Sequence, residues 1–343
     1  MADIEVQDTA RPPADAAKSV PMTGPGIARL QPIRVEGKFF FAGDQKVFLK
    51  GVTYGPFPVG SDGTQFPTPE RARQDFALMA TAGINTVRVF TVPPVWLLDI
   101  AGEFGLRVLA GIPWSQHITF LDSEEVKAEI RRTIMAGVRS LQRHPALLAY
   151  MIGNEIPPDM IRWHGADKVR DFLASLVKDV KSHDPTGLVS YANFPSTEYL
   201  TVDFTDFLCF NVYLHNEGAF RRYIARLHNL AVDRPLVLTE FGMDSMREGQ
   251  EHQAETLSWQ VKTAFEIGCA GTCVFAWTDE WFTGGHLIED WEFGLVDADR
   301  QPKAAFTVSP SAIAGRCRRR CRAIPASRSW SAPIMPTGRW TSA

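Results

Sequence analysis

Eight short apolar runs, each ended by turn-forming or polar residues, alternate with longer amphipathic stretches between residues 37 and 306. This alternation is typical of repeated strand–helix units around a parallel sheet. We predict that each run is a β-strand of one α/β domain. The runs are VFLKGVTYG (47–55), INTVRVF (84–90), LRVLAGIPW (106–114), LLAYMIGNE (147–155), GLVSYANF (187–194), DFLCFNVYL (206–214), PLVLTEFG (235–242) and GTCVFAWT (271–278).

Apolar residues spaced three and four apart predict helices between these strands. The connection from the fifth strand to the sixth, residues 195–202, is too short for a full helix. The segment FFFAGDQKVF ahead of the first strand predicts a hairpin that covers the base of a barrel. The predicted helices span residues 69–81, 123–142, 168–182, 218–230 and 251–267.

The predicted order of elements fits a single (β/α)8 TIM barrel. A doubly wound open sheet is the alternative, but no GxGxxG motif follows any predicted strand. Polar residues instead lie at the carboxyl ends of many strands, where barrel enzymes hold their catalytic groups. We therefore predict a barrel with its functional site at that end.

Composition divides the chain into three regions. Residues 1–33 are rich in Pro, Ala and Gly and predict a disordered lead-in, residues 34–306 form the barrel, and residues 307–343 form a basic, disordered tail. The net charge is −3, but the tail holds seven Arg and no Asp, Glu or Lys, which leaves −10 on the rest. An acidic body argues against nucleic acid as the main partner, although a basic nucleic-acid arm is an alternative role for the tail.

Neither a membrane span nor a secretory signal is visible in the sequence, which predicts a cytoplasmic protein. The five Cys lack paired CxxC spacing, so buried free thiols are expected rather than a disulfide framework or a zinc site. The His residues show no HxH or HExxH spacing, and we predict no catalytic metal and no cofactor.

Two predicted strands end in a carboxylate: the fourth in Gly-Asn-Glu at Glu155, and the seventh in Thr-Glu-Phe-Gly at Glu240. A barrel brings the ends of its fourth and seventh strands to opposite sides of one pocket. Two carboxylates facing each other across a pocket are the groups that cleave a glycosidic bond. The alternative is that each Glu is a structural member of an ion pair.

With these motifs the sequence resembles the retaining β-glycosidases of the barrel clan that includes glycoside hydrolase families 2 and 5, and most closely the barrel domain of family 2. The resemblance covers residues 37–306 and rests on segments that occur in the family's order. These segments are VFLKGVTYG, INTVRVF, HPALLAYMIGNE, FNVY, TEFG and FGLVDADRQPKAAF. The resemblance implies that Glu155 is the acid/base and Glu240 the nucleophile.

Neighbouring residues acquire roles from the same resemblance. Asn154 is expected to contact the sugar 2-hydroxyl, a contact that strengthens in the transition state. Arg88 ends the second strand, and a buried guanidinium there needs an anionic partner, for which Glu240 is the match in the family. Tyr213 resembles the tyrosine that hydrogen-bonds the nucleophile.

Trp277 resembles the tryptophan that forms the floor of the sugar site, with core packing as the alternative. The aromatic residues of WTDEWFTGGHLIEDWEFG predict a carbohydrate platform that extends beyond one sugar. Further residues near predicted strand ends are candidates for sugar subsites: Trp114, His117, Asn211, Tyr54, Glu280, Asp279 and Trp281.

We conclude from the sequence that the chain is a retaining β-glycoside hydrolase or transglycosylase. Its expected partners are β-linked oligo- or polysaccharides, with β-glucan favoured. No NxK triplet occurs, the feature with which the resembling β-glucuronidases hold the sugar carboxylate, so glucuronides are disfavoured. Only about 36 residues precede the predicted folded region, which favours an open cleft over a closed pocket.

Two other functions compete with this prediction. One is a glycan-binding barrel with little turnover that serves a polysaccharide synthase. Read one nucleotide out of phase, residues 329–343 are compatible with the start of a family 2 glycosyltransferase, so the tail could be a frameshift product and the barrel could work with such an enzyme. The other is a phosphate-binding barrel enzyme, for which FTGGH at 282–286 is a poor phosphate loop.

Overall fold

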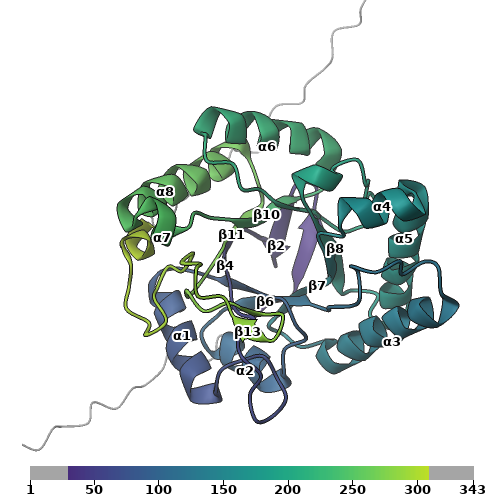
Figure 1. The fold of residues 1–343 in the computed structure, drawn as a ribbon, viewed down its shortest axis with the longest axis horizontal. Helices are drawn as coiled ribbons and strands as arrows, with labels where there is room; N and C mark the ends of the chain where they lie inside the picture. Colours follow the sequence, from purple (N-terminus) through teal and green to yellow (C-terminus); the bar gives the residue numbers. More distant parts are fainter. Residues whose placement is uncertain (1–29, 309–343) are drawn as a thin grey trace, which may run out of the picture.

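The protein is described from a computed structural model, which covers residues 30–308. The predicted lead-in and basic tail lie almost entirely outside these residues. Eight parallel strands close into a barrel in the order β10-β11-β4-β5-β6-β7-β8-β9, and Figure 1 shows the helices arranged around it. The predicted (β/α)8 barrel is therefore confirmed.

Each of the eight predicted strands is present. The observed strands are shorter than the apolar runs because the runs also include flanking residues, most of them apolar, such as Phe90 and Phe194. The barrel strands are β4 (Leu49–Thr53), β5 (Thr86–Val89), β6 (Arg107–Gly111), β7 (Leu147–Asn154), β8 (Leu188–Asn193), β9 (Leu208–Asn211), β10 (Leu236–Phe241) and β11 (Gly271–Val274).

The five predicted helices are confirmed as α1 (Pro69–Thr81), α3 (Glu124–Leu141), α5 (Ala166–His183), α6 (Glu217–Ala231) and α8 (Gln250–Ile267). Side-chain caps fix several of their starts: Ser123 accepts from the amide of Val126, and Asn216 accepts from that of Ala219. Between β8 and β9 the chain forms only a short 3₁₀ turn, η1 (Pro195–Thr197), as the short connection predicts.

Three further helices were not singled out from the sequence: α2 (Val95–Glu103), α4 (Pro158–His164) and α7 (Ser245–Glu248). The first seven of the nine residues of α2 read VWLLDIA, which is apolar on nearly every face, so the helix lacks the contrast between faces that marks an amphipathic helix. The other two helices span two turns or fewer, too short for a periodic signal.

A three-stranded antiparallel sheet, β1 (Ile33–Glu36), β2 (Phe39–Ala42) and β3 (Gln45–Val47), precedes the barrel. Its side chains pack on the inward-facing residues of the barrel: Phe40 is fully buried and meets the ring of Phe207 edge to face, with centroids 5.2 Å apart. This sheet confirms the predicted cover at the base of the barrel. It begins at Ile33, earlier than the start near Gly37 that the sequence indicates.

Two apolar clusters form the core. The smaller one fills the inside of the barrel against the β1–β3 sheet and includes Leu109, Met151, Cys209 and Cys273. The larger one lies mainly between the strands and the surrounding helices. Cys209, Cys269 and Cys273 are buried free thiols, as the sequence analysis expects. Across residues 30–308, no helix has the length and apolar character needed to cross a membrane.

We expect Phe40→Ala to lower the free energy of unfolding by about 3–5 kcal/mol, because it empties a fully buried aromatic site at the base of the barrel. Urea denaturation monitored by circular dichroism measures this loss. Phe41→Ala is the matched control: Phe41 lies next to Phe40 and is only half-buried, so its loss should be much smaller. Equal losses for the two variants would contradict the burial of Phe40.

Candidate active site

The carboxyl ends of β5, β7, β9 and β10 converge on a cluster of polar side chains. Glu155 directly follows β7, and Glu240 lies near the end of β10. The spatial order of the barrel strands places these two ends on different sides of its mouth, with β8 and β9 between them along the shorter path. The two carboxyl groups nevertheless belong to one hydrogen-bond network.

Arg88 near the end of β5 is the most buried charged group of the cluster, with a side chain only 2% exposed. Its Nη1 atom donates to Glu240 Oε1 at 2.7 Å and to the carbonyl oxygen of Thr239 at 2.8 Å. Its Nη2 atom donates to Asn154 Oδ1 at 2.6 Å. The expected pairing of Arg88 with Glu240 is thus found, and the same guanidinium also orients Asn154.

Asn211 at the end of β9 joins the two carboxyl groups. Its Nδ2 atom donates to Glu155 Oε1 at 2.8 Å and to Glu240 Oε1 at 2.7 Å. The opposite end of the amide, Oδ1, accepts from the Thr239 hydroxyl at 2.8 Å, which fixes which way the amide points. Because one nitrogen contacts both carboxyl groups, Glu155 and Glu240 face each other across a short gap.

The two carboxyl groups have different environments. Burial, followed by the charge of Glu240, raises the pKa of Glu155 to about 7, against the hydrogen bond from Asn211 and the charge of Arg88. Glu240 has the direct Arg88 ion pair, and its second oxygen accepts from the Tyr213 hydroxyl at 3.1 Å. The site therefore holds one carboxyl suited to stay protonated near neutrality beside one that has a cationic partner.

Tyr213 lies where the sequence predicts, beside Glu240. Burial, followed by the charge of Glu240, holds the pKa of the Tyr213 phenol well above its usual value. The phenol therefore remains a hydrogen-bond donor to the carboxylate at neutral pH.

The carboxyl groups open onto a cavity of about 520 Å³. Phe194, Pro195 and Ser196, at the η1 turn, line it. Five aromatic residues that we call the aromatic wall also line it: Phe90, Phe275, Trp281, Trp291 and Phe293.

The rings of the aromatic wall contact one another. Trp281 lies against Phe90 and Phe275, with centroids 5.0 and 4.9 Å away, and against Trp291 at 6.4 Å and a tilt of 34°. The sequence indicated a platform in the segment that carries Trp281, Trp291 and Phe293. It did not indicate Phe90 and Phe275, which belong to apolar strand runs and look like core residues there.

A second, smaller recess of about 160 Å³ adjoins this cavity, since Phe90 and Asn154 line both. It contains Trp114 and His117, two of the predicted subsite residues. The Trp114 indole nitrogen donates to the carbonyl oxygen of Ile152 at 2.7 Å, and His117 is exposed. Gln116, which the sequence analysis did not single out, also lines this recess.

The structure places Trp277 elsewhere than expected. β11 ends at Val274, and it is Phe275 that reaches the cavity, whereas Trp277 is fully buried in the core beside Phe306. The expectation that Trp277 forms the floor of the sugar site is therefore corrected: Trp277 does not line the cavity, and Phe275 does. The apolar run continues four residues beyond the end of β11, so the sequence alone does not show which aromatic residue of FAW reaches the cavity.

Tyr54 and Glu280 also lie outside the residues that line the cavity. The fully buried Tyr54 hydroxyl donates to Asp75 at 2.8 Å, and Arg300 donates to the other oxygen of Asp75 at 3.0 Å. Arg300 also pairs with Glu280. These residues form a structural network, because each polar group of the two candidates is used to hold the segment after β11.

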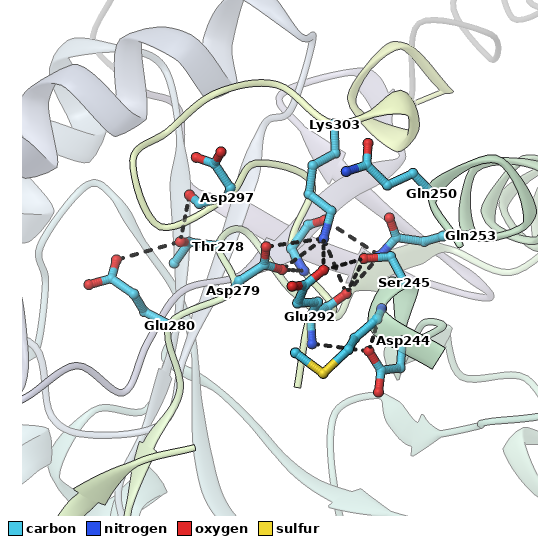
Figure 2. A network of polar contacts seen from close by, with 12 residues as sticks. Asp244, Ser245, Gln250, Gln253, Thr278, Asp279, Glu280, Glu292, Asp297 and Lys303 are labelled. Atoms are coloured by element: carbon cyan, nitrogen blue, oxygen red, sulfur yellow. Dashed lines mark hydrogen bonds and ion pairs between the residues drawn. The ribbon is translucent and has the colours of Figure 1, made fainter. Parts of the chain in front are cut away.

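The segment that carries most of the aromatic wall is anchored by the network in Figure 2. The buried ammonium of Lys303 donates to Asp279 at 2.9 and 3.1 Å and to the backbone carbonyl of Glu292 at 3.2 Å. Asp244 accepts from the amide of Glu292, and Ser245 donates to the carbonyl of the same residue. Trp281 and Trp291 are thus held between fixed points on either side.

In the part of the chain that the structure describes, no group of three or more His, Cys, Asp or Glu side chains could hold a metal ion. The chemistry of the site rests on its carboxyl, amide, guanidinium and phenol groups.

Solved structures with the same fold are numerous. A β-glucuronidase from Ruminococcus gnavus in complex with D-glucuronic acid superposes with a TM-score of 0.70 at 20% identity, over 82% of this chain and 52% of that chain. A family 2 β-galacturonidase from Eisenbergiella tayi gives 0.69 at 19% identity, over 83% and 54%. A β-glucuronidase from Bifidobacterium dentium gives 0.72 at 17%, over 83% and 49%. The chain thus spans about half the length of these proteins.

The comparison with curated proteins gave no significant match. The family described as glycosyl hydrolases family 2, TIM barrel domain, matches residues 33–279, which is most of the chain and includes every barrel strand. On this match, together with the observed barrel, the chain belongs to glycosyl hydrolases family 2 and carries the TIM barrel domain of that family.

Proposed function

We propose that this barrel is a retaining β-glycoside hydrolase in which Glu240 is the nucleophile and Glu155 the acid/base. The observation that carries the proposal is the shared donor Asn211. Contacts of 2.8 and 2.7 Å from one nitrogen keep the two accepting oxygens of Glu155 and Glu240 no more than about 5.5 Å apart, which favours the short carboxyl separation of retaining enzymes. An inverting enzyme needs a wider gap, with room for a water molecule.

In the first step Glu240 attacks the anomeric carbon while Glu155 transfers its proton to the departing oxygen. The Arg88 guanidinium and the Tyr213 phenol stabilise the negative charge of Glu240 before the attack. Asn154, held by Arg88, lies beside Glu155 and can contact the sugar 2-hydroxyl. In the second step Glu155 removes a proton from water, which attacks the glycosyl-enzyme and releases Glu240.

The charge of Glu240 couples the two steps. While Glu240 is a carboxylate, its charge helps to hold the pKa of Glu155 near 7, so that Glu155 carries the proton it must donate. Once Glu240 is esterified that charge is gone, and the pKa of Glu155 falls. Glu155 then becomes the carboxylate that a general base must be.

We propose a neutral β-linked glycan as the substrate, with β-glucan favoured. Among the described residues that line the 520 Å³ cavity there is no Lys, Arg or His to pair with a sugar carboxylate. The absence of an NxK triplet points the same way. The R. gnavus and E. tayi enzymes are named for uronic acid sugars, so the substrate proposed here differs from theirs.

The aromatic wall supports a chain substrate over a single sugar. The cavity is of a size that holds extended ligands, and indole faces bind the C–H surfaces of pyranose rings. A sugar bound along the wall could also serve as the acceptor in place of water, which makes transglycosylation a second outcome of the same intermediate.

The first prediction concerns the nucleophile. Glu240→Ala should lower kcat on an aryl β-glucoside by on the order of 10⁶-fold, as expected when a covalent nucleophile is removed. Added azide should restore turnover and yield an α-glucosyl azide, whose configuration is read by NMR. In the matched control, Glu155→Ala with a dinitrophenyl glucoside, azide should yield the β-glucosyl azide instead. The opposite configurations would reverse the two roles.

The second prediction concerns pH. The raised pKa means that Glu155 is protonated below about pH 7, so kcat/KM should be highest there and fall tenfold per pH unit above it. In Glu155→Gln, measured with a dinitrophenyl glucoside that needs no proton, this fall should vanish. An unchanged fall in the variant would assign the ionisation to another group.

The third prediction concerns the aromatic wall. Trp291→Ala should reduce kcat/KM on β-gluco-oligosaccharides roughly tenfold, equivalent to about 1.4 kcal/mol of lost stacking, and leave an aryl β-glucoside little changed. Trp163→Ala removes a tryptophan that is 67% exposed on α4 and should alter neither value. Equal losses on short and long substrates would count against a chain-binding wall.

A further inference from the structure

The carboxyl end of β7 extends further than the end of its neighbour β6. β6 ends at Gly111, which pairs with Met151, so the β7 residues after Met151 have no β6 partner. On the other side the pairing with β8 shifts between Met151 and Asn154, so that β7 carries one residue more than its partner. Such a bulge leaves backbone groups outside the regular ladder. These groups belong to the residues that lead into Glu155.

Side chains from neighbouring elements take the place of the missing strand. Trp114 donates to the carbonyl oxygen of Ile152 at 2.7 Å, and the Tyr191 hydroxyl accepts from the amide of Ile156 at 2.9 Å. Along the backbone, Asn154 lies between Ile152 and Ile156, and Gln116 binds both its N–H and its C=O group. The Gln116 Oε1 atom accepts from the Asn154 amide at 3.2 Å, and its Nε2 atom donates to the Asn154 carbonyl.

The side-chain amide of Gln116 is chemically equivalent to a peptide group, with one acceptor and a donor in the same plane. It therefore supplies Asn154 with one acceptor and one donor, the two hydrogen bonds that an extended β6 would otherwise provide. Glu155 comes next and adopts a φ of +51°, a left-handed conformation that non-glycine residues rarely hold without support. The direction of the Glu155 side chain thus depends on a backbone that Gln116 fixes from one side.

We propose that Gln116 is a positioning residue for the acid/base: its amide substitutes for absent strand pairing and aims the Glu155 carboxyl at the departing oxygen. This inference rests on the proposed function of Glu155. Gln116 has no direct hydrogen bond to Glu240, whose contacts come from Arg88, Asn211 and Tyr213. Its loss should therefore impair proton transfer and spare nucleophilic attack.

A comparison of leaving groups separates these two effects. Gln116→Met keeps the side-chain length and removes both hydrogen bonds. With a phenyl glycoside, which needs the proton, kcat/KM should fall by about 10- to 100-fold, the cost of an ångström-scale misplacement. With the dinitrophenyl glycoside, which does not, kcat/KM should fall clearly less, only by the weakened contact of Asn154 with the sugar 2-hydroxyl. Similar losses on both substrates, or on neither, would overturn the proposal.

Gln253→Met is the matched control. Gln253 is also a buried glutamine that donates to backbone carbonyls, those of Met243 and Glu292, but it lies at α8 and away from β7. It is expected to lower the melting temperature without changing the ratio of the two kcat/KM values. A changed ratio in this variant would mean that the loss of any such side-chain-to-backbone hydrogen bond disturbs proton transfer, and Gln116 would have no special role.

A crystal structure of Gln116→Met provides a readout that needs no substrate. We expect Asn154 and Glu155 to move relative to the wild-type protein while Glu240 and Arg88 stay in place. Unmoved Asn154 and Glu155 would refute the positioning role even if the barrel hydrolyses glycosides. In the converse outcome, the wild-type protein turns over no glycoside while Glu155 is displaced in the variant. That result would refute the proposed function but support the role of Gln116 in holding the backbone at Glu155.

Discussion

The buried guanidinium of Arg88 is the constraint on which the rest of the site depends. A charge that is almost fully removed from water is tolerated only with anionic and hydrogen-bonding partners, and Arg88 finds them on three other strands: Asn154 on β7, Asn211 on β9 and Thr239 with Glu240 on β10. These contacts cross the mouth of the barrel. Removing the guanidinium would leave Glu240 buried without its cation, so the same group serves both the closed barrel and the geometry of the carboxyl pair.

The sequence predicts the barrel and the polar centre well for one physical reason. Residues at the carboxyl end of a parallel barrel strand must meet, whatever the loops between them do. Glu155, Glu240, Asn154, Arg88 and Tyr213 all lie at or just beyond strand ends, and the structure joins them through hydrogen bonds. Asn211, taken from the sequence only as a subsite candidate, is the residue that links both carboxyl groups.

What the sequence could not predict depends on the paths of loops and on local irregularity of the sheet. The choice between Phe275 and Trp277 depends on where β11 ends, and alternation of apolar residues does not define that end. Gln116 has no motif of its own, because its importance arises from a bulge in β7 that only the pairing reveals. Tyr54 and Glu280 lie near strand ends, but Tyr54 is hydrogen-bonded to Asp75 and Glu280 is paired with Arg300.

Three of the five residues of the aromatic wall come from a segment that carries neither carboxyl group. Trp281, Trp291 and Phe293 lie on one continuous segment whose fixed points, Asp279, Glu292 and Lys303, contact neither carboxyl group of the pair. In the proposed function, bond cleavage and glycan binding therefore rest on different segments of the chain. Exchange of the segment between its anchors would then graft a different glycan preference onto the same barrel, with the carboxyl pair left in place.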